Sequence, residues 1–215
     1  MKALDIIYED ESCIVINKPA GLAVQGGKGI SVSLDSILSQ TRAQRPLLVH
    51  RLDKDTSGII LVAKNKAAAA VYSRLLAEKT VIKRYTAICK GSPVQPESII
   101  REQLYIRGRI KNSETRCRLL GNNNDFSLLE LELGTGRMHQ IRRHLAMSDT
   151  PILGDDKYGD FTLNHILRKT MKLRHLLLHA SRLIIPRTQE TKSLDLCAPL
   201  PAYFNDFQLC DILVS

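Results

Sequence analysis

Short apolar runs, each bounded by turn-forming residues, set the pattern of this 215-residue chain. Runs of this kind are typical of strands, whereas apolar residues at helical spacing occur at 34–38, 65–79 and about 134–147. Because neighbouring strands are joined mostly by turns, we expect an α+β fold with a mixed, largely antiparallel central sheet and flanking helices. The predicted strands cover residues 13–16, 47–49, 58–63, 84–89, 126–133, 176–178 and 183–185.

The length of the chain fits one domain, and we expect a single domain over residues 1–215. Segment 91–97 contains Pro93 and Pro96, so two closely packed halves are expected to meet near residues 91–100. The longest apolar run of the first half, 59–63, is far shorter than the roughly 20 residues of a membrane span. The first residues also lack the apolar core of a signal peptide. We therefore expect a cytoplasmic monomer with no membrane contact.

A large positive charge restricts the partners of this chain. Lys and Arg number 31 against 22 Asp and Glu, which gives a net charge of +9 and a pI near 9.4. Such an excess suits nucleic acid or an anionic membrane, and separated clusters of bases suit a surface that binds phosphates. Solvated faces of an ordinary basic protein would give the same composition. The clusters are Arg101, Arg107, Arg109, Lys111, Arg116 and Arg118; Arg137, Arg142 and Arg143; and Arg168, Lys169, Lys172 and Arg174.

Metal binding finds little support in the sequence. The five cysteines include no pair at C-x-x-C spacing, so neither a zinc ribbon nor a disulfide framework is predicted. His175 and His179 are four residues apart without the intervening Glu of a zinc-protease helix. Asp155, Asp156 and Asp160 fit no calcium-loop spacing and indicate a plain turn.

The densest polar segment is His50-Arg51-Leu52-Asp53-Lys54-Asp55-Thr56-Ser57-Gly58, between two predicted strands. Loops held by a rigid sheet often carry function. If Asp53 and Arg51 were both partly enclosed, the cation would keep the carboxylate ionised and ready to act as a nucleophile or base. A turn whose polar side chains bind backbone amides is the plainer interpretation. A glycosidase pair formed by Asp53 and Asp55 is a third, although the chain has no Trp and few aromatic residues.

The same segment resembles the signature loop of the RluA-type pseudouridine synthases, and five further segments resemble that family in the family's order. The similarity runs from about residue 5 to about 204 and is closest to the members that modify large-subunit ribosomal RNA. The five segments are Asn17-Lys18-Pro19-Ala20-Gly21, Lys83-Arg84-Tyr85-Thr86-Ala87, Thr135-Gly136-Arg137-Met138-His139-Gln140-Ile141-Arg142, Pro151-Ile152-Leu153-Gly154-Asp155 with Tyr158-Gly159, and Leu177-Leu178-His179-Ala180.

This resemblance implies the pseudouridine synthase fold, with a catalytic cleft across its sheet, and an isomerase that acts on uridine in RNA without cofactor or metal. The bond from ribose C1′ to N1 of uracil breaks, and the base rejoins through C5. Asp53 matches the family's catalytic aspartate, which either attacks C1′ or removes a ribose proton. Tyr85 matches the active-site tyrosine, Arg142 the arginine that pairs with the aspartate, and Arg51 a residue that helps displace the target nucleotide.

The start of the third predicted helix suggests further contacts with RNA. Thr135 is a plausible N-cap, which places Arg137 in the first turn, where the helix dipole disfavours a cation. A phosphate bound at that turn would relieve the conflict. We therefore expect RNA-binding roles for Arg137, His139 and Gln140, and also for Lys83 beside the active-site tyrosine.

The choice of RNA stays open in the sequence. The family similarity starts at about residue 5, so no separate N-terminal RNA-binding domain is expected. Gln25 stands where the large-subunit ribosomal members commonly have His, and Ile185 precedes Pro186 where a His is common. Large-subunit ribosomal RNA is the preferred substrate, transfer RNA is the nearest alternative, and a non-catalytic RNA-binding or ribosome-assembly protein is the alternative from another class.

Overall fold

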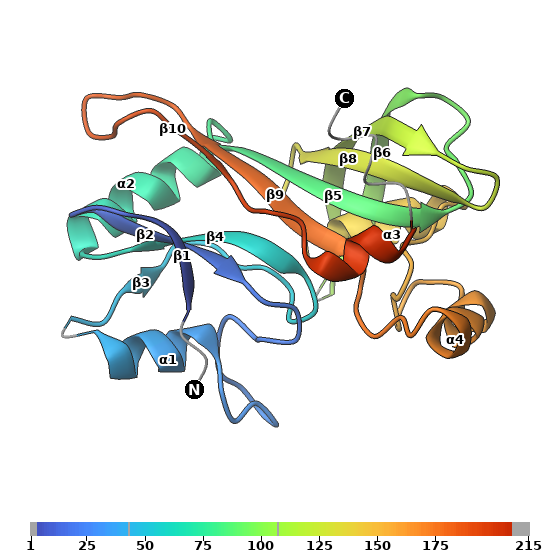
Figure 1. The fold of residues 1–215 in the computed structure, drawn as a ribbon. Helices are drawn as coiled ribbons and strands as arrows, with labels where there is room; N and C mark the ends of the chain where they lie inside the picture. The colour runs from blue at the N-terminus through green and yellow to red at the C-terminus, as the bar shows by residue number, and fades with distance from the viewer. Residues whose placement is uncertain (1–3, 43, 107, 208–215) are drawn as a thin grey trace. The chain divides into compact units, whose positions relative to one another are not determined.

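The computed structural model describes residues 4–42, 44–106 and 108–207, so Arg107 and Cys210 lie outside the described part (Figure 1). The chain forms two compact units. Unit 1 comprises the described residues through Lys83 together with Ala180–Pro199, and unit 2 comprises Arg84–His179 and the described residues from Leu200. Residues 91–100, where two halves were expected to meet, lie inside unit 2, in the turn after β5 (Ile82–Lys90) and the start of β6 (Glu97–Ile106).

Unit 1 is built on the predicted apolar strands. β1 (Asp5–Glu9) pairs antiparallel with β2 (Cys13–Lys18), β2 pairs antiparallel with β4 (Ser57–Ala63), and β9 (Leu178–Ile185) lies on the other side of β4. β3 (Leu47–Leu48) pairs with β4, and β10 (Leu194–Cys197) pairs with β9. Every residue of β4 is buried, which explains why its sequence is an apolar run without alternation.

Two helices of unit 1 cover this sheet (Figure 1). α1 (Leu34–Thr41) begins with a capping box at Ser33, and α2 (Lys66–Ala77) begins at the predicted N-cap Asn65, whose side chain accepts the Ala68 N–H. α2 ends two residues earlier than predicted. Its buried face packs on the strand residues that point to one side of the sheet, and the shared core contains Cys13, Val15, Ile59, Leu61, Ala63, Ala68, Tyr72, Leu75, Val81, Leu183, Ile185 and Ala198.

Unit 2 contains four antiparallel strands in the order β5-β8-β7-β6, with β8 at Phe126–Leu133 and β7 at Arg109–Asn122. β6 and β7 form a long hairpin, with β6 at the edge. The remaining elements are α3 (Gln140–Met147), which contacts β6 and β7, α4 (Phe161–Thr170) and a 3-10 turn at Ala202–Phe207. The two strands predicted at 176–178 and 183–185 are the single strand β9.

The fold class is therefore the predicted one, an α+β arrangement with a largely antiparallel sheet and few helices. Within the described residues, none of the helices combines the length and the apolar character that a membrane crossing requires.

Candidate active site

The Asp53 loop of unit 1 connects β3 to β4, as the sequence predicted. Leu52 and Thr56 are buried at 3% and 2% exposure, whereas Arg51 is exposed and Asp53 is half-buried. The buried side chains of Leu52 and Thr56 thus anchor the loop in the protein interior, whereas Arg51 remains at the surface.

A buried lysine anchors the backbone directly after Asp53. The Lys18 ammonium is 0% exposed and donates to the carbonyl oxygens of Pro19, Leu22 and Lys54 at 3.0, 2.8 and 3.0 Å. The Gly21 N–H also donates to the Lys54 carbonyl, at 3.0 Å. An ammonium has three donors, and all three are used here. Two segments that the sequence analysis identified separately, 17–21 and 50–58, are thus bound together within unit 1.

Lys18 also supplies the enclosed positive charge of this loop. Burial lowers the pKa of Lys18 to about 8, and the charges of Asp55 and Asp53 act in the opposite direction. The sequence analysis considered Arg51 as the enclosed cation beside Asp53, but Arg51 is exposed, and the enclosed cation is Lys18.

His50 fixes the start of the loop. Its Nε2 accepts the Leu61 N–H at 2.9 Å, and burial, aided by the charge of Lys83, lowers the pKa of His50 to about 3. The imidazole is therefore neutral at pH 7 with its proton on Nδ1. Lys83, an expected RNA-binding residue, is half-buried, and burial lowers its pKa as well.

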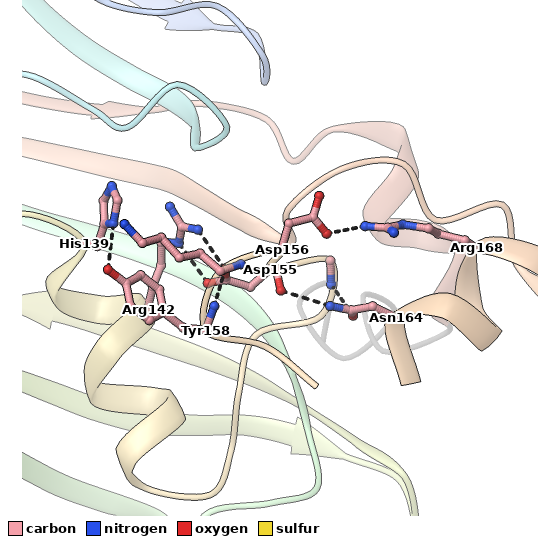
Figure 2. A network of polar contacts seen from close by, with 9 residues as sticks. His139, Arg142, Asp155, Asp156, Tyr158, Asn164 and Arg168 are labelled. Carbon is pink, nitrogen blue, oxygen red and sulfur yellow. Dashed lines mark hydrogen bonds and ion pairs between the residues drawn. The ribbon is translucent and has the colours of Figure 1, made fainter. Parts of the chain in front are cut away.

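Unit 2 holds the other two expected catalytic residues. Tyr85 lies on β5 opposite Leu131 and is 7% exposed. Arg142 lies on α3, and its Nε and Nη2 donate to the Asp155 carboxylate at 2.8 and 2.7 Å (Figure 2). Both partners of this ion pair are buried. The expected pairing of Arg142 with Asp53 stays a prediction.

The turn that carries Asp155 is held by several hydrogen bonds. The same carboxylate accepts the backbone N–H groups of Lys157 and Tyr158 at 2.8 and 3.0 Å. On α4, Asn164 accepts the Gly154 N–H and donates to the Asp155 carbonyl, at 2.8 and 3.0 Å (Figure 2). Burial opposes ionisation of Asp155, but the hydrogen bonds from Arg142 and from the two amides hold its pKa below the ordinary value.

Tyr158 joins this network through both its ring and its hydroxyl. The Arg142 guanidinium lies 5.3 Å from the centre of the ring, and the hydroxyl is 3.0 Å from His139 Nδ1 (Figure 2). A guanidinium at this distance from an aromatic face is attracted to it. His139, an expected RNA-binding residue, is thereby linked to the surroundings of Arg142.

The helix that carries Arg142 begins later than predicted. α3 starts at Gln140, and its N-cap is His139 in a left-handed conformation with φ 53°, so Thr135 is not the N-cap and Arg137 precedes the helix. The dipole argument for a phosphate at Arg137 is therefore wrong. Arg137 is exposed, and its Nε donates to the Asn112 carbonyl at 3.3 Å.

Gln140 shapes the segment before α3. Its side chain is 2% exposed, and its amide nitrogen donates to the Glu114 carbonyl and to Thr115 Oγ1 at 2.8 and 3.0 Å. Its amide oxygen accepts the Thr135 hydroxyl and the Arg137 N–H at 2.6 and 3.1 Å. All polar groups of this amide are thus used inside the protein, and a contact of Gln140 with RNA stays a prediction.

Lys18, Asp155 and Tyr158 are the residues whose importance the sequence analysis missed. Lys18 and Asp155 stand in recognised motifs, but neither spacing nor composition showed that their charges are buried. The predicted plain turn at 155–160 is confirmed, since Asp155 binds its own turn and Asp160 caps α4. Among the residues that the structure describes, no group of three or more His, Cys, Asp and Glu is arranged to hold a metal ion.

Comparison with known proteins adds a direct test. The sequence profile of the RNA pseudouridylate synthase family matches residues 12–147. The ribosomal large subunit pseudouridine synthase C of Rickettsia typhi is 40% identical over an alignment of 216 residues, gaps included. The alignment covers 93% of this chain and 69% of that protein.

Solved structures agree. The human protein RNA pseudouridylate synthase domain containing 4 superposes with a TM-score of 0.79 at 27% identity, covering 98% of this chain and 93% of that one. The human protein RNA pseudouridylate synthase domain containing 1 gives a TM-score of 0.76 at 27% identity and covers 92% and 83%. The chain therefore belongs to the RNA pseudouridylate synthase family, the isomerases that convert uridine to pseudouridine in RNA.

Proposed function

We propose that this chain isomerises specific uridines of large-subunit ribosomal RNA, with Asp53, Tyr85 and Arg142 as the catalytic residues. The substrate follows from the relatives named for the large ribosomal subunit, among them the Rickettsia typhi and Vibrio cholerae proteins, which are 40% and 35% identical. The net charge of +9 suits a polyanionic substrate.

Asp53 acts on the ribose of the target nucleotide in this proposal. A uridine inside stacked RNA is out of reach, so it must first be extruded, at a cost of about a few kcal/mol. In this proposal Arg51, which is exposed and two residues before Asp53, holds the extruded strand through a phosphate. The Asp53 carboxylate then removes a ribose proton as the C1′–N1 bond breaks, which leaves a glycal and the detached base. C5 of the rotated base bonds to C1′ while Asp53 returns its proton to the ribose, and the base then loses its C5 proton and takes one up at N1. No electrons are exchanged with another molecule, because the product is an isomer of the substrate.

The anchored loop is the observation that carries this proposal. Lys18 binds the Lys54 carbonyl and lies close enough to Asp53 for the two charges to attract. A catalytic group must be held in place before the substrate arrives, since reorganisation during the reaction raises the barrier. Lys18 provides that support to a carboxylate whose own side chain is half-buried.

Tyr85 and Arg142 have supporting roles. The ring of Tyr85 offers a flat face for stacking on the extruded base, and its hydroxyl helps to remove the C5 proton after the base has rejoined. Arg142 offers a planar guanidinium to the Asp53 carboxylate, a geometry that Lys cannot reproduce. Because Asp155 fixes the Nε side of Arg142, the orientation of that guanidinium within unit 2 is set before RNA binds.

The chemical part of the proposal is tested with Asp53→Asn and with Asp55→Asn, an exposed aspartate of the same loop, as the matched control. Single-turnover assays on transcribed ribosomal RNA fragments should show a loss of at least about 10³-fold for Asp53→Asn and nearly full activity for Asp55→Asn. RNA affinity should stay nearly unchanged in both variants. Full activity of Asp53→Asn would remove the mechanism.

The substrate is tested by mapping pseudouridines in all RNA of cells with and without the gene. Sites missing only from large-subunit ribosomal RNA support the proposal, whereas sites missing only from transfer RNA reassign the enzyme to that substrate. An unchanged map in every RNA would support a non-catalytic role. We further propose that the protein acts in the cytoplasm as a monomer. A measurement of the mass of the protein in solution tests the monomeric state.

A further inference from the structure

The end of the β6–β7 hairpin in unit 2 carries an exposed apolar pair. Tyr105 and Ile110 lie directly opposite each other in the antiparallel register, and they are 67% and 65% exposed. Opposed residues of an antiparallel pair point to the same face of the sheet. One face of the hairpin end therefore presents an aromatic ring and an aliphatic side chain to solvent.

Bases, with no acid among them, occupy other positions of the hairpin end. Residues 103–113 contain three bases, Arg107, Arg109 and Lys111, and no acid. The three acids of the two strands, Glu97, Glu102 and Glu114, all lie outside this stretch. Arg109 and Lys111 are exposed, and each is adjacent in sequence to Ile110, so their side chains point away from the face of the apolar pair.

Two more arginines reach the hairpin end from the α3 region. Arg143 on α3 donates from Nη1 to the Tyr105 carbonyl at 3.2 Å, and Arg137 donates from Nε to the Asn112 carbonyl at 3.3 Å. Within the described part of the chain, no ion pair joins Arg109, Lys111, Arg137 or Arg143 to an acid. Other bases of the hairpin differ, since Arg101 pairs with Glu114 and Arg118 with Glu130.

The hairpin is fixed to the helix that carries Arg142. Ser113 on β7 and His144 on α3 are buried, and Ser113 Oγ lies 2.7 Å from His144 Nε2. Together with the bonds from Arg143 and Arg137, this contact places the hairpin end at a defined position beside α3. The hairpin end thus combines an exposed apolar pair with cations that form no ion pair. Such a surface suits the binding of an anionic partner that has flat apolar groups.

We propose that this hairpin end binds single-stranded RNA next to the target uridine. One base stacks on Tyr105 on one face, and the strand passes over the hairpin end, so that its neighbouring phosphates are held by Arg109 and Lys111 on the opposite face and by Arg137 and Arg143 from the α3 region. Aromatic stacking accepts any base, and cations follow the backbone of a single strand. The inference rests on the proposed function, because it takes RNA as the substrate. It adds a site at which a flanking nucleotide is held apart from the catalytic residues.

The test of the aromatic contact measures the affinity of the full chain for a 12-nucleotide single-stranded uridine-containing RNA. Tyr105→Ala should weaken binding about tenfold, and Tyr105→Phe should restore it, because stacking needs the ring and not the hydroxyl. Phe161→Ala, which removes a 61% exposed aromatic ring at the start of α4, is the control and should bind normally. Equal affinity of Tyr105→Ala and Phe161→Ala would overturn the proposal.

The test of the phosphate contacts measures the salt dependence of the same affinity. The double variant Arg109→Ala/Lys111→Ala should reduce the slope of log K against log salt by about 1.4, since each contact with a single strand contributes about 0.7. Arg118→Ala, whose guanidinium is paired with Glu130, should leave the slope unchanged. An unchanged slope in the double variant would overturn this part.

These measurements separate the inference from the proposed function. Binding is read without turnover, so an active Asp53→Asn enzyme would refute the mechanism and leave the Tyr105 result intact. In single-turnover assays on ribosomal RNA fragments, Tyr105→Ala should raise the RNA concentration needed for half-maximal rate and keep the maximal rate. A reduced maximal rate with unchanged half-saturation would count against a binding role for the hairpin end.

Discussion

Arg142 donates two hydrogen bonds, from Nε and Nη2, to the buried carboxylate of Asp155 at 2.8 and 2.7 Å. The pair joins α3 to the turn before α4. Removing one partner of a buried, doubly hydrogen-bonded ion pair leaves the other charge without compensation. Asp155 is therefore the residue that decides whether Arg142 keeps its orientation.

Asp155→Asn should lower the free energy of unfolding by about 3 kcal/mol and slow isomerisation by about 100-fold through misplacement of Arg142. Urea unfolding and single-turnover rates measure the two effects. The control is Asp156→Asn, since Asp156 is the adjacent, exposed aspartate and pairs with Arg168 at the surface. Equal behaviour of the two variants would show that the buried pair has no special role.

The buried pair makes the stability of the folded protein depend on pH. The pKa of Asp155 is lowered in the folded protein, so its contribution to stability is complete above the unfolded value of about 3.9. The contribution is lost as the pH falls through the folded value. The Arg142–Asp155 pair is therefore intact at neutral pH.

Lys18→Met should reduce the rate of isomerisation about tenfold or more, because the Lys54 carbonyl loses its donor and the carboxylates of the loop lose their enclosed cation. RNA affinity should change little. Lys54→Met removes an exposed lysine from the same loop and serves as the control. The measurement is the single-turnover rate at saturating RNA, and similar rates for Lys18→Met and the unchanged protein would exclude a positioning role.

The Asp53 loop could be predicted because the strands that delimit it are its direct neighbours in sequence. Apolar runs on both sides of residues 50–58 indicated two strands, and the polar residues between them had to form a connection. The support of the loop was not predictable by the same argument. Lys18 belongs to β2, and only the pairing of β2 with β4 brings its ammonium to the Lys54 carbonyl.

The hairpin of β6 and β7 was missed for a different reason. Exposed and half-buried charged residues occupy much of both strands, so the apolar signal of a strand is weak. β6 is an edge strand, and an edge tolerates this composition. Leu104 and Cys117 are among the few buried apolar residues that reveal the inward face.

The start of α3 was predicted too early, because the side chain of Thr135 binds the side chain of Gln140 and does not cap the helix. Thr135 has the composition of an N-cap, but its hydroxyl donates to the Gln140 side chain. The residue that precedes the helix is His139, which adopts a left-handed conformation and makes no side-chain cap. Such an arrangement depends on Gln140 reaching β7, a tertiary contact that no helix-capping rule contains.

Gly58→Ala should destabilise unit 1 by about 3 kcal/mol or more. Gly58 has φ +106°, and an added Cβ would lie 2.2 Å from the Ala180 carbonyl oxygen on β9. Backbone atoms cannot yield as a flexible side chain does, so β4 and β9 would have to separate. Gly26→Ala is the control, because nothing lies within 4 Å of its added Cβ. Equal urea midpoints for the two variants would contradict this account, whereas loss of soluble protein in Gly58→Ala alone would agree with it.

His144 should make the stability of the protein depend on pH in the mildly acidic range. Ser113 Oγ donates to the Glu102 carbonyl at 2.7 Å, so it accepts from His144 Nε2–H, and the buried Nδ1 has no partner among the described residues. Burial, with the charge of Arg143, lowers the pKa of His144 to about 4. The neutral imidazole is thus favoured in the folded state.

The unfolded protein binds a proton at this histidine below about pH 6.5, whereas the folded protein resists it until about pH 4. The contribution of neutral His144 is therefore complete above pH 6.5 and is lost as the pH falls toward 4, by about 3 kcal/mol. His144→Gln keeps a donor for Ser113 but cannot take up a proton, so its unfolding free energy should fall less between pH 7 and pH 4. Urea unfolding at both pH values gives the two differences, and an equal fall in the variant and the unchanged protein would show that His144 does not titrate in this range.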